Sequence, residues 1–174
     1  MRGNRTMGSA LADANLITIG QLDQANERLL ELMGGDPEPR QCTLIGVLVN
    51  DLKVQTEEDI LLHMADAGIG LVCLAECEIP EEVKKALDPA ACWATWTIPF
   101  DREGDYHLIA TAHYYSPAVR SYWEKQCKGP VLWYGTTIEE IADYLEKLVS
   151  DRALAEPPPV PAPAPTPSAA NAPR

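Results

Sequence analysis

The chain has 174 residues, 46% of them hydrophobic, which is enough for one ordinary domain or for two small units that share a core. Its formal net charge of −12 opposes nonspecific binding to DNA or to anionic lipid, so we expect no nucleic-acid partner. The sequence holds no run of 18 apolar residues and no apolar stretch behind its N-terminal arginines, which predicts a cytoplasmic protein without direct membrane insertion.

The first seventy residues predict four helices that form a repeat with a period of 38 residues. In the first copy, a short helix over residues 5–14 precedes a helix over 19–33, which Thr18 caps. In the second copy, a helix over about 41–52 precedes one that Thr56 caps. The recurring positions are small, apolar or capping residues, namely Gly8 with Gly46, Leu11 with Val49, Leu16 with Val54, Thr18 with Thr56 and Leu22 with Ile60. Such self-similarity indicates one supersecondary unit used twice.

The residues after Gly70 have the pattern of a small α/β unit. Short apolar runs predict four strands, over residues 71–75, 93–100, 106–112 and 131–134. The second and third of these form a hairpin with a polar loop over 101–105. Capping residues predict three helices, over 81–87, over 118–126 and from Ile138 onward. The predicted fold class is therefore α+β, a four-helix repeat packed with a small mixed sheet and followed by a disordered tail.

The predicted organisation has three regions: a helical repeat subdomain over 1–67, a small α/β subdomain over 68–152, and a tail over 153–174. From Glu156 onward the chain holds eight of its fifteen prolines, alternating mostly with small residues. This composition predicts a disordered, polyproline-like segment that cannot form a core. Two interpretations stay open, a passive spacer and a tether or ligand for a proline-binding partner.

Cysteines and histidines are the side chains that could carry metal or acid–base chemistry. All five cysteines are expected to be free thiols. The spacing of Cys73 and Cys77, with His63 or His107, is too loose to predict zinc, so we expect neither metal nor cofactor. His113 precedes two tyrosines, and this cluster could form a small catalytic pocket or a loop at the edge of the sheet. No phosphate-binding Gly-x4-Gly-Lys-Ser/Thr loop is present, and we predict no enzymatic activity.

Several short motifs follow one another in an order known from one family. They are Thr6-Met7-Gly8, Leu16-Ile17-Thr18, Leu44-Ile45-Gly46, and then segments 79–83, 96–100, 105–112 and 137–141. Over residues 5–150 the chain resembles the N-terminal domain of the hexameric ATPases that drive type II secretion and type IV pilus assembly, here standing without the ATPase core. The resemblance implies a docking role toward the inner-membrane platform of such machinery.

In some members of that family the helical repeats bind cyclic di-GMP through an arginine, glycines and a glutamine in each copy. The departures here are Thr6 and Leu44 for the arginines, Asn15 and Lys53 for the second glycines, and Leu29 and Ala67 for the glutamines. An anionic ligand would thereby lose its bidentate guanidinium donors. The residues left as weak candidates for such a site are Arg5, Gly8, Leu11, Gly46 and Val49.

Three functional hypotheses follow. The leading one is a non-catalytic protein–protein interaction or regulatory module, whose partner belongs to secretion or pilus machinery. The alternative is a sensor that binds a cyclic dinucleotide along the helical repeats. The third is a small enzyme that uses His113.

Overall fold

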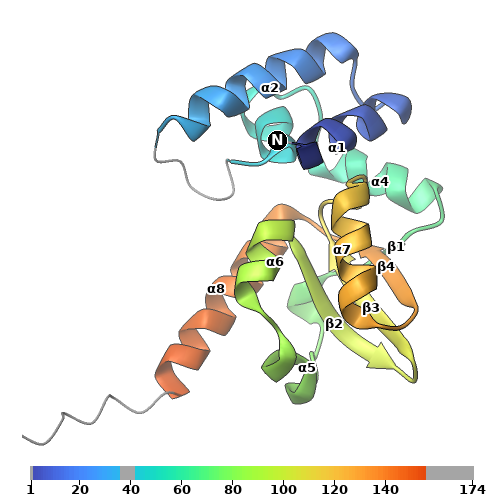
Figure 1. Ribbon diagram of the computed structural model, residues 1–174, viewed down its shortest axis with the longest axis vertical. Helices are drawn as coiled ribbons and strands as arrows, with labels where there is room; N and C mark the ends of the chain where they lie inside the picture. The colour runs from blue at the N-terminus through green and yellow to red at the C-terminus, as the bar shows by residue number, and fades with distance from the viewer. Residues whose placement is uncertain (1, 36–41, 156–174) are drawn as a thin grey trace, which may run out of the picture.

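A computed structural model describes residues 2–35 and 42–155, with the side chains of 6–35 and 42–154 (Figure 1). The predicted disordered tail lies outside this range, apart from residues 153–155, which form the last turn of the final helix. The mixed α+β fold class is confirmed, with helices at the N-terminal end and one four-stranded sheet in the second half.

The helical unit contains α1 (Arg2–Asp13), α2 (Ile19–Met33), α3 (Leu44–Gly46), the π-helix η1 (Val47–Asp51) and α4 (Glu57–Asp66). Helix α2 has the predicted bounds because its start is fixed locally. The hydroxyl of Thr18 accepts from the backbone N–H of Gln21 at 3.2 Å, and the Gln21 side chain accepts from the N–H of Thr18 at 2.8 Å. This reciprocal capping box satisfies two N–H groups that the helix leaves free.

The third predicted helix, over about 41–52, is present over residues 44–51, but most of it is not α-helical. Only three residues are α-helical, and the turn that follows is a π-helix in which the N–H of Leu52 donates to the carbonyl of Val47 at 2.9 Å. The sequence here contains β-branched residues and an Asn-Asp pair, which have low α-helix propensity. A π-turn inserts one extra residue, so the second copy of the repeat differs from the first at this point.

Two backbone features nevertheless recur at the 38-residue spacing. Asn15 and Lys53 both have left-handed backbone conformations, with φ of 58° and 52°. Thr18 and Thr56 both cap a helix through the N–H three residues later. These observations agree with a duplicated unit, while the four-helix repeat as a whole stays a prediction.

The α/β unit contains β1 (Gly70–Leu71), η2 (Leu74–Glu76), α5 (Glu81–Ala86), α6 (Pro89–Thr95), β2 (Thr97–Glu103), β3 (Tyr106–Thr111), α7 (Pro117–Cys127), β4 (Val131–Gly135) and α8 (Ile138–Ala155). The strand order is β1-β4-β3-β2, with β1, β4 and β3 parallel and β2 antiparallel to β3. Helix α7 lies over one face of this sheet and α8 over the other (Figure 1).

Three predictions in this unit need correction. The strand expected over 71–75 is only the two-residue β1, and a 3₁₀ turn occupies its end. Residues 93–95 belong to α6, which sequence analysis missed although Asp88 caps it and proline follows at its first position. The hairpin loop is shorter than predicted, because β2 continues through Glu103 and pairs with β3 up to Tyr106.

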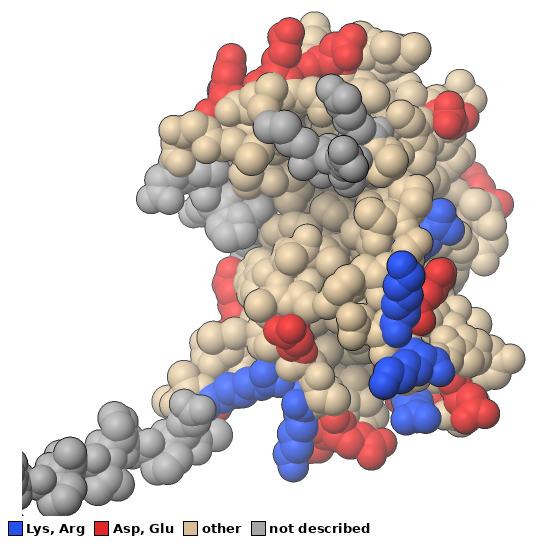
Figure 2. All heavy atoms as spheres, viewed as in Figure 1, with Lys and Arg blue, Asp and Glu red and all other residues tan. Residues whose placement is uncertain are grey.

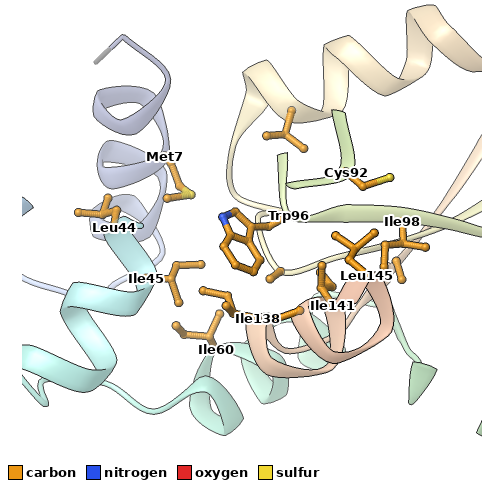
Figure 3. Close-up of a cluster of buried hydrophobic side chains, with 14 of the residues drawn as sticks. Met7, Leu44, Ile45, Ile60, Cys92, Trp96, Ile98, Ile138, Ile141 and Leu145 are labelled. Atoms are coloured by element: carbon orange, nitrogen blue, oxygen red, sulfur yellow. The ribbon is translucent and has the colours of Figure 1, made fainter. Parts of the chain in front are cut away.

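One hydrophobic core runs through both units. In Figure 3 the indole of Trp96, at the end of α6, lies among Met7 and Ile45 of the helical unit and Ile138 of α8. The backbone of Trp96 is left-handed, with φ of 49°, and this turn directs the ring toward the helical unit. The two units therefore stabilise each other through shared apolar burial.

Candidate functional site

The predicted ligand-binding residues of α1 lie in the interior. Leu11 is only 1% exposed, and Gly8 is buried. A Cβ atom at Gly8 would lie 2.3 Å from Cδ1 of Leu22, so the glycine allows α1 and α2 to pack closely. Neither residue offers surface to a ligand in this conformation.

The candidates of the second copy are similarly placed. Gly46 is buried, and its N–H donates to the hydroxyl of Thr43 at 2.8 Å, while Val49 is half-buried on the π-helix. Leu44, which stands where the family has an arginine, has no exposed surface. The side chain of Arg5 lies outside the described residues. The proposed ligand set therefore stays an untested prediction whose described members are buried or half-buried.

His113 is also buried, with 8% of its surface exposed. It lines a cavity of about 330 Å³ between the two units, together with Met7, Thr43 and Trp96. Burial lowers the pKa of His113 to about 4, so the imidazole is neutral at pH 7. Its Nε2 atom has no hydrogen-bond partner in the described part of the chain. These properties suit a residue of the junction better than a general base, which needs contact with substrate.

Two glutamates link the start of α8 to neighbouring elements, Glu57 to α4 of the helical unit and Glu140 to η2 of the α/β unit. An Oε2 atom of Glu57 accepts from the N–H of Ile138 at 3.1 Å, and Oε2 of Glu140 accepts from the N–H of Leu74 at 2.7 Å. Burial raises the pKa of Glu57, although its hydrogen bond from Ile138 acts in the opposite direction. Carboxylates at a helix N-terminus complement its dipole, so this pair has a structural role.

All five cysteines are free thiols, as expected. Cys92 is fully buried, and burial raises the pKa of its thiol to about 12. Burial also raises the pKa of Cys77, whose thiol donates to the carbonyl of Cys73. Within residues 2–35 and 42–155, no group of three or more His, Cys, Asp or Glu side chains could hold a metal ion.

An exposed stripe on α2 is the first surface feature that suits recognition. Ile19, Leu30 and Met33 are 72%, 54% and 55% exposed, and their spacing places them on one side of the helix. Acidic residues of α2 lie among and beside them: Asp23, Glu27 and Glu31. Figure 2 shows acidic side chains gathered along the edge of the molecule that α2 forms in Figure 1. The α2 surface, defined by these residues, therefore combines an apolar stripe with negative charge.

A groove of about 920 Å³ along α8 is the second surface feature. Its walls are one face of α8 and the segment from η2 to α5. Tyr144 and Leu148 of α8 and Ile79 of the opposite wall supply apolar surface, and charged side chains of both signs also line the groove. Sequence analysis missed this groove because it depends on how α5 packs beside a helix more than fifty residues later in the chain.

None of the helices within the described residues is long and apolar enough to cross a membrane. No family model matches the sequence, and no curated protein matches it. Solved structures do resemble the fold. A structure of MshE with cyclic di-GMP has a TM-score of 0.52 at 15% identity, and the match covers 82% of this chain and 97% of that one.

Two crystal forms of the N-terminal domain of XpsE have TM-scores of 0.51 and 0.53, at 18% and 17% identity. These matches cover 79% and 83% of this chain, and 90% and 94% of the XpsE domain. The resemblance to such N-terminal domains, expected from the order of the sequence motifs, is confirmed. At these identities the similarity is one of fold alone.

Proposed function

We propose that this chain is a non-catalytic interaction module that docks onto a protein of secretion or pilus machinery. The observation that carries the proposal is the fold match to the N-terminal domain of XpsE, which covers 90% and 94% of that domain. Burial of His113 and Cys92 also supports a non-catalytic role. Among the described histidines and cysteines these two have the most strongly shifted pKa values, and neither is exposed on the surface.

The α2 surface is the docking face we infer. Its exposed apolar side chains would contribute burial, and its carboxylates would select a partner with basic residues around an apolar centre. The chain's formal charge of −12 would also speed association with such a basic surface at low salt. The inferred partner is therefore the basic cytoplasmic face of a platform protein that anchors the machinery to the inner membrane.

Binding of the full chain to purified cytoplasmic domains of secretion and pilus platform proteins, measured by calorimetry, tests the proposal. We expect Leu30→Asp on α2 to weaken binding at least tenfold, while Leu62→Asp on α4, which is 60% exposed, leaves it unchanged. Equal effects of the two variants would place the interface elsewhere, and no binding to any such domain would refute the function.

The cyclic dinucleotide alternative is not favoured, because leucine and threonine replace the arginines and the described candidate residues are largely buried. Titration of the same protein with cyclic di-GMP separates the hypotheses. A saturable heat signal that Gly46→Leu abolishes, with α2 variants unaffected, would support the sensor instead.

A further inference from the structure

We infer that the groove along α8 binds the chain's own proline-rich segment, residues 157–167, which lies outside the described residues. Helices α8 and α5, which line the groove, lie at the opposite end of the molecule from α2 (Figure 1), so failure of this inference would leave the proposed docking of α2 untouched.

The groove is closed at each end by a hydrogen-bonded link between its walls. At one end Glu140 of α8 accepts from the N–H of Leu74. At the other end Nη2 of Arg152 donates to the carbonyls of Lys84, in the last turn of α5, and of Leu87, its C-cap. Between these links the lining residues of α8 recur every three or four positions, so a single face of the helix lines the groove along its length.

The length and position of the segment fit this groove. Residues 140–152 span about 18 Å at 1.5 Å per residue, and about six residues of polyproline helix cover that distance at 3.1 Å each. Helix α8 ends at Ala155, one turn beyond Arg152, so the segment starts beside the end of the groove that the Arg152 link bounds. The eleven residues of 157–167 leave enough chain to reverse direction before entering it.

The chemistry of the two surfaces is complementary. Seven of the eleven residues are proline, so the segment presents backbone carbonyl acceptors and few N–H donors. The residues that line the groove include the aromatic Tyr144 and, among charged side chains of both signs, Lys85 and Lys147. The hydroxyl of Tyr144 is buried without a hydrogen-bond partner in the described part of the chain, whereas buried tyrosine hydroxyls usually have one. Proline-rich segments generally bind to such aromatic-lined grooves.

NMR relaxation of the ¹⁵N-labelled full chain tests the inference. The amides of Val160, Ala162 and Ala164 report on the segment, because these residues have a backbone N–H and the prolines between them do not. We expect their order parameters to approach the value of about 0.85 that is typical of rigid backbone. Values below about 0.6, typical of flexible chain, would overturn the inference.

Two variants and one control make the test specific. Ala75→Trp places a large side chain in the groove at an exposed position and should release the segment. Replacing Pro161, Pro163 and Pro165 by glycine should release it as well, and this variant cannot disturb the folded core. Ala90→Trp, an exposed position on α6 that does not line the groove, should have no effect. Two results would overturn binding within one chain. In the first, neither the groove variant nor the segment variant lowers the order parameters. In the second, the order parameters fall on dilution while a dimer dissociates.

Discussion

The pH dependence of stability offers a sharp test of the buried junction around His113. Burial lowers the pKa of His113 from 6.5 to about 4 in the folded chain. Between these two values the unfolded chain takes up a proton that the folded chain does not, so stability falls as the pH falls. With 1.36 kcal/mol per pKa unit, the loss from this residue between pH 7 and pH 5 is about 2 kcal/mol, and it levels off below pH 4.

The assay is urea unfolding at pH 7 and pH 5, followed by tryptophan fluorescence, on the wild-type chain, His113→Gln and His107→Gln. Glutamine at 113 cannot titrate, so the drop in unfolding free energy between the two pH values should be smaller by about 2 kcal/mol in this variant. His107 lies half-exposed in β3, and its variant should retain the wild-type drop. The raised pKa of Glu57 acts in the opposite direction but is common to all three proteins. An identical drop in wild type and His113→Gln would refute the assignment of a neutral, buried imidazole.

Three further predictions concern packing, backbone strain and thiol reactivity. Gly8→Ala should lower the unfolding free energy by about 1–3 kcal/mol, because the new Cβ would overlap a leucine of α2. Its control, Gly20→Ala, has open space around the new Cβ and should be neutral or stabilising by up to about 1 kcal/mol. Equal urea midpoints for the two variants would contradict this prediction. Lys53→Gly should raise the unfolding free energy by about 1 kcal/mol in the same assay, because the left-handed backbone at this position, with φ of 52°, strains a non-glycine residue. A lower unfolding free energy in this variant would contradict that strain. Iodoacetamide with peptide mapping should modify the exposed Cys73 in the native chain and Cys92 only after unfolding, and early modification of Cys92 would contradict its burial.

The elements that sequence analysis predicted well are those with local signals. Helix α2 has a capping box at its start and a Gly-Gly pair at its end, and both bounds matched. The strand β1 shows the opposite case. Its partner is β4, where Gly70 pairs with Tyr134, and a Cβ at Gly70 would lie 2.7 Å from that ring. Pairing across 64 residues of chain leaves no local pattern from which its length could be predicted.

The candidate site shows the same division. Its residues were chosen from positions in a repeat, and a repeat position says nothing about which face of a helix a neighbour covers. Gly8 and Leu11 fall on the face of α1 that the rest of the unit covers. The groove along α8 requires α5 to lie beside a distant helix, so it was outside the reach of periodicity altogether.

The residues needed to form the backbone turns of the helical unit differ from the residues needed to bind a ligand on it. The left-handed residues Asn15 and Lys53, together with the capping threonines Thr18 and Thr56, turn the chain between helices in both halves of the unit. These features need only a tolerated φ and one hydroxyl, so non-glycine residues can satisfy them at a cost of about 1–2 kcal/mol each. An anionic ligand, in contrast, requires exposed cationic forks, and Leu44 with no exposed surface cannot supply one. A chain can therefore keep this fold without a site for an anionic ligand, so the fold alone does not imply that such a ligand binds.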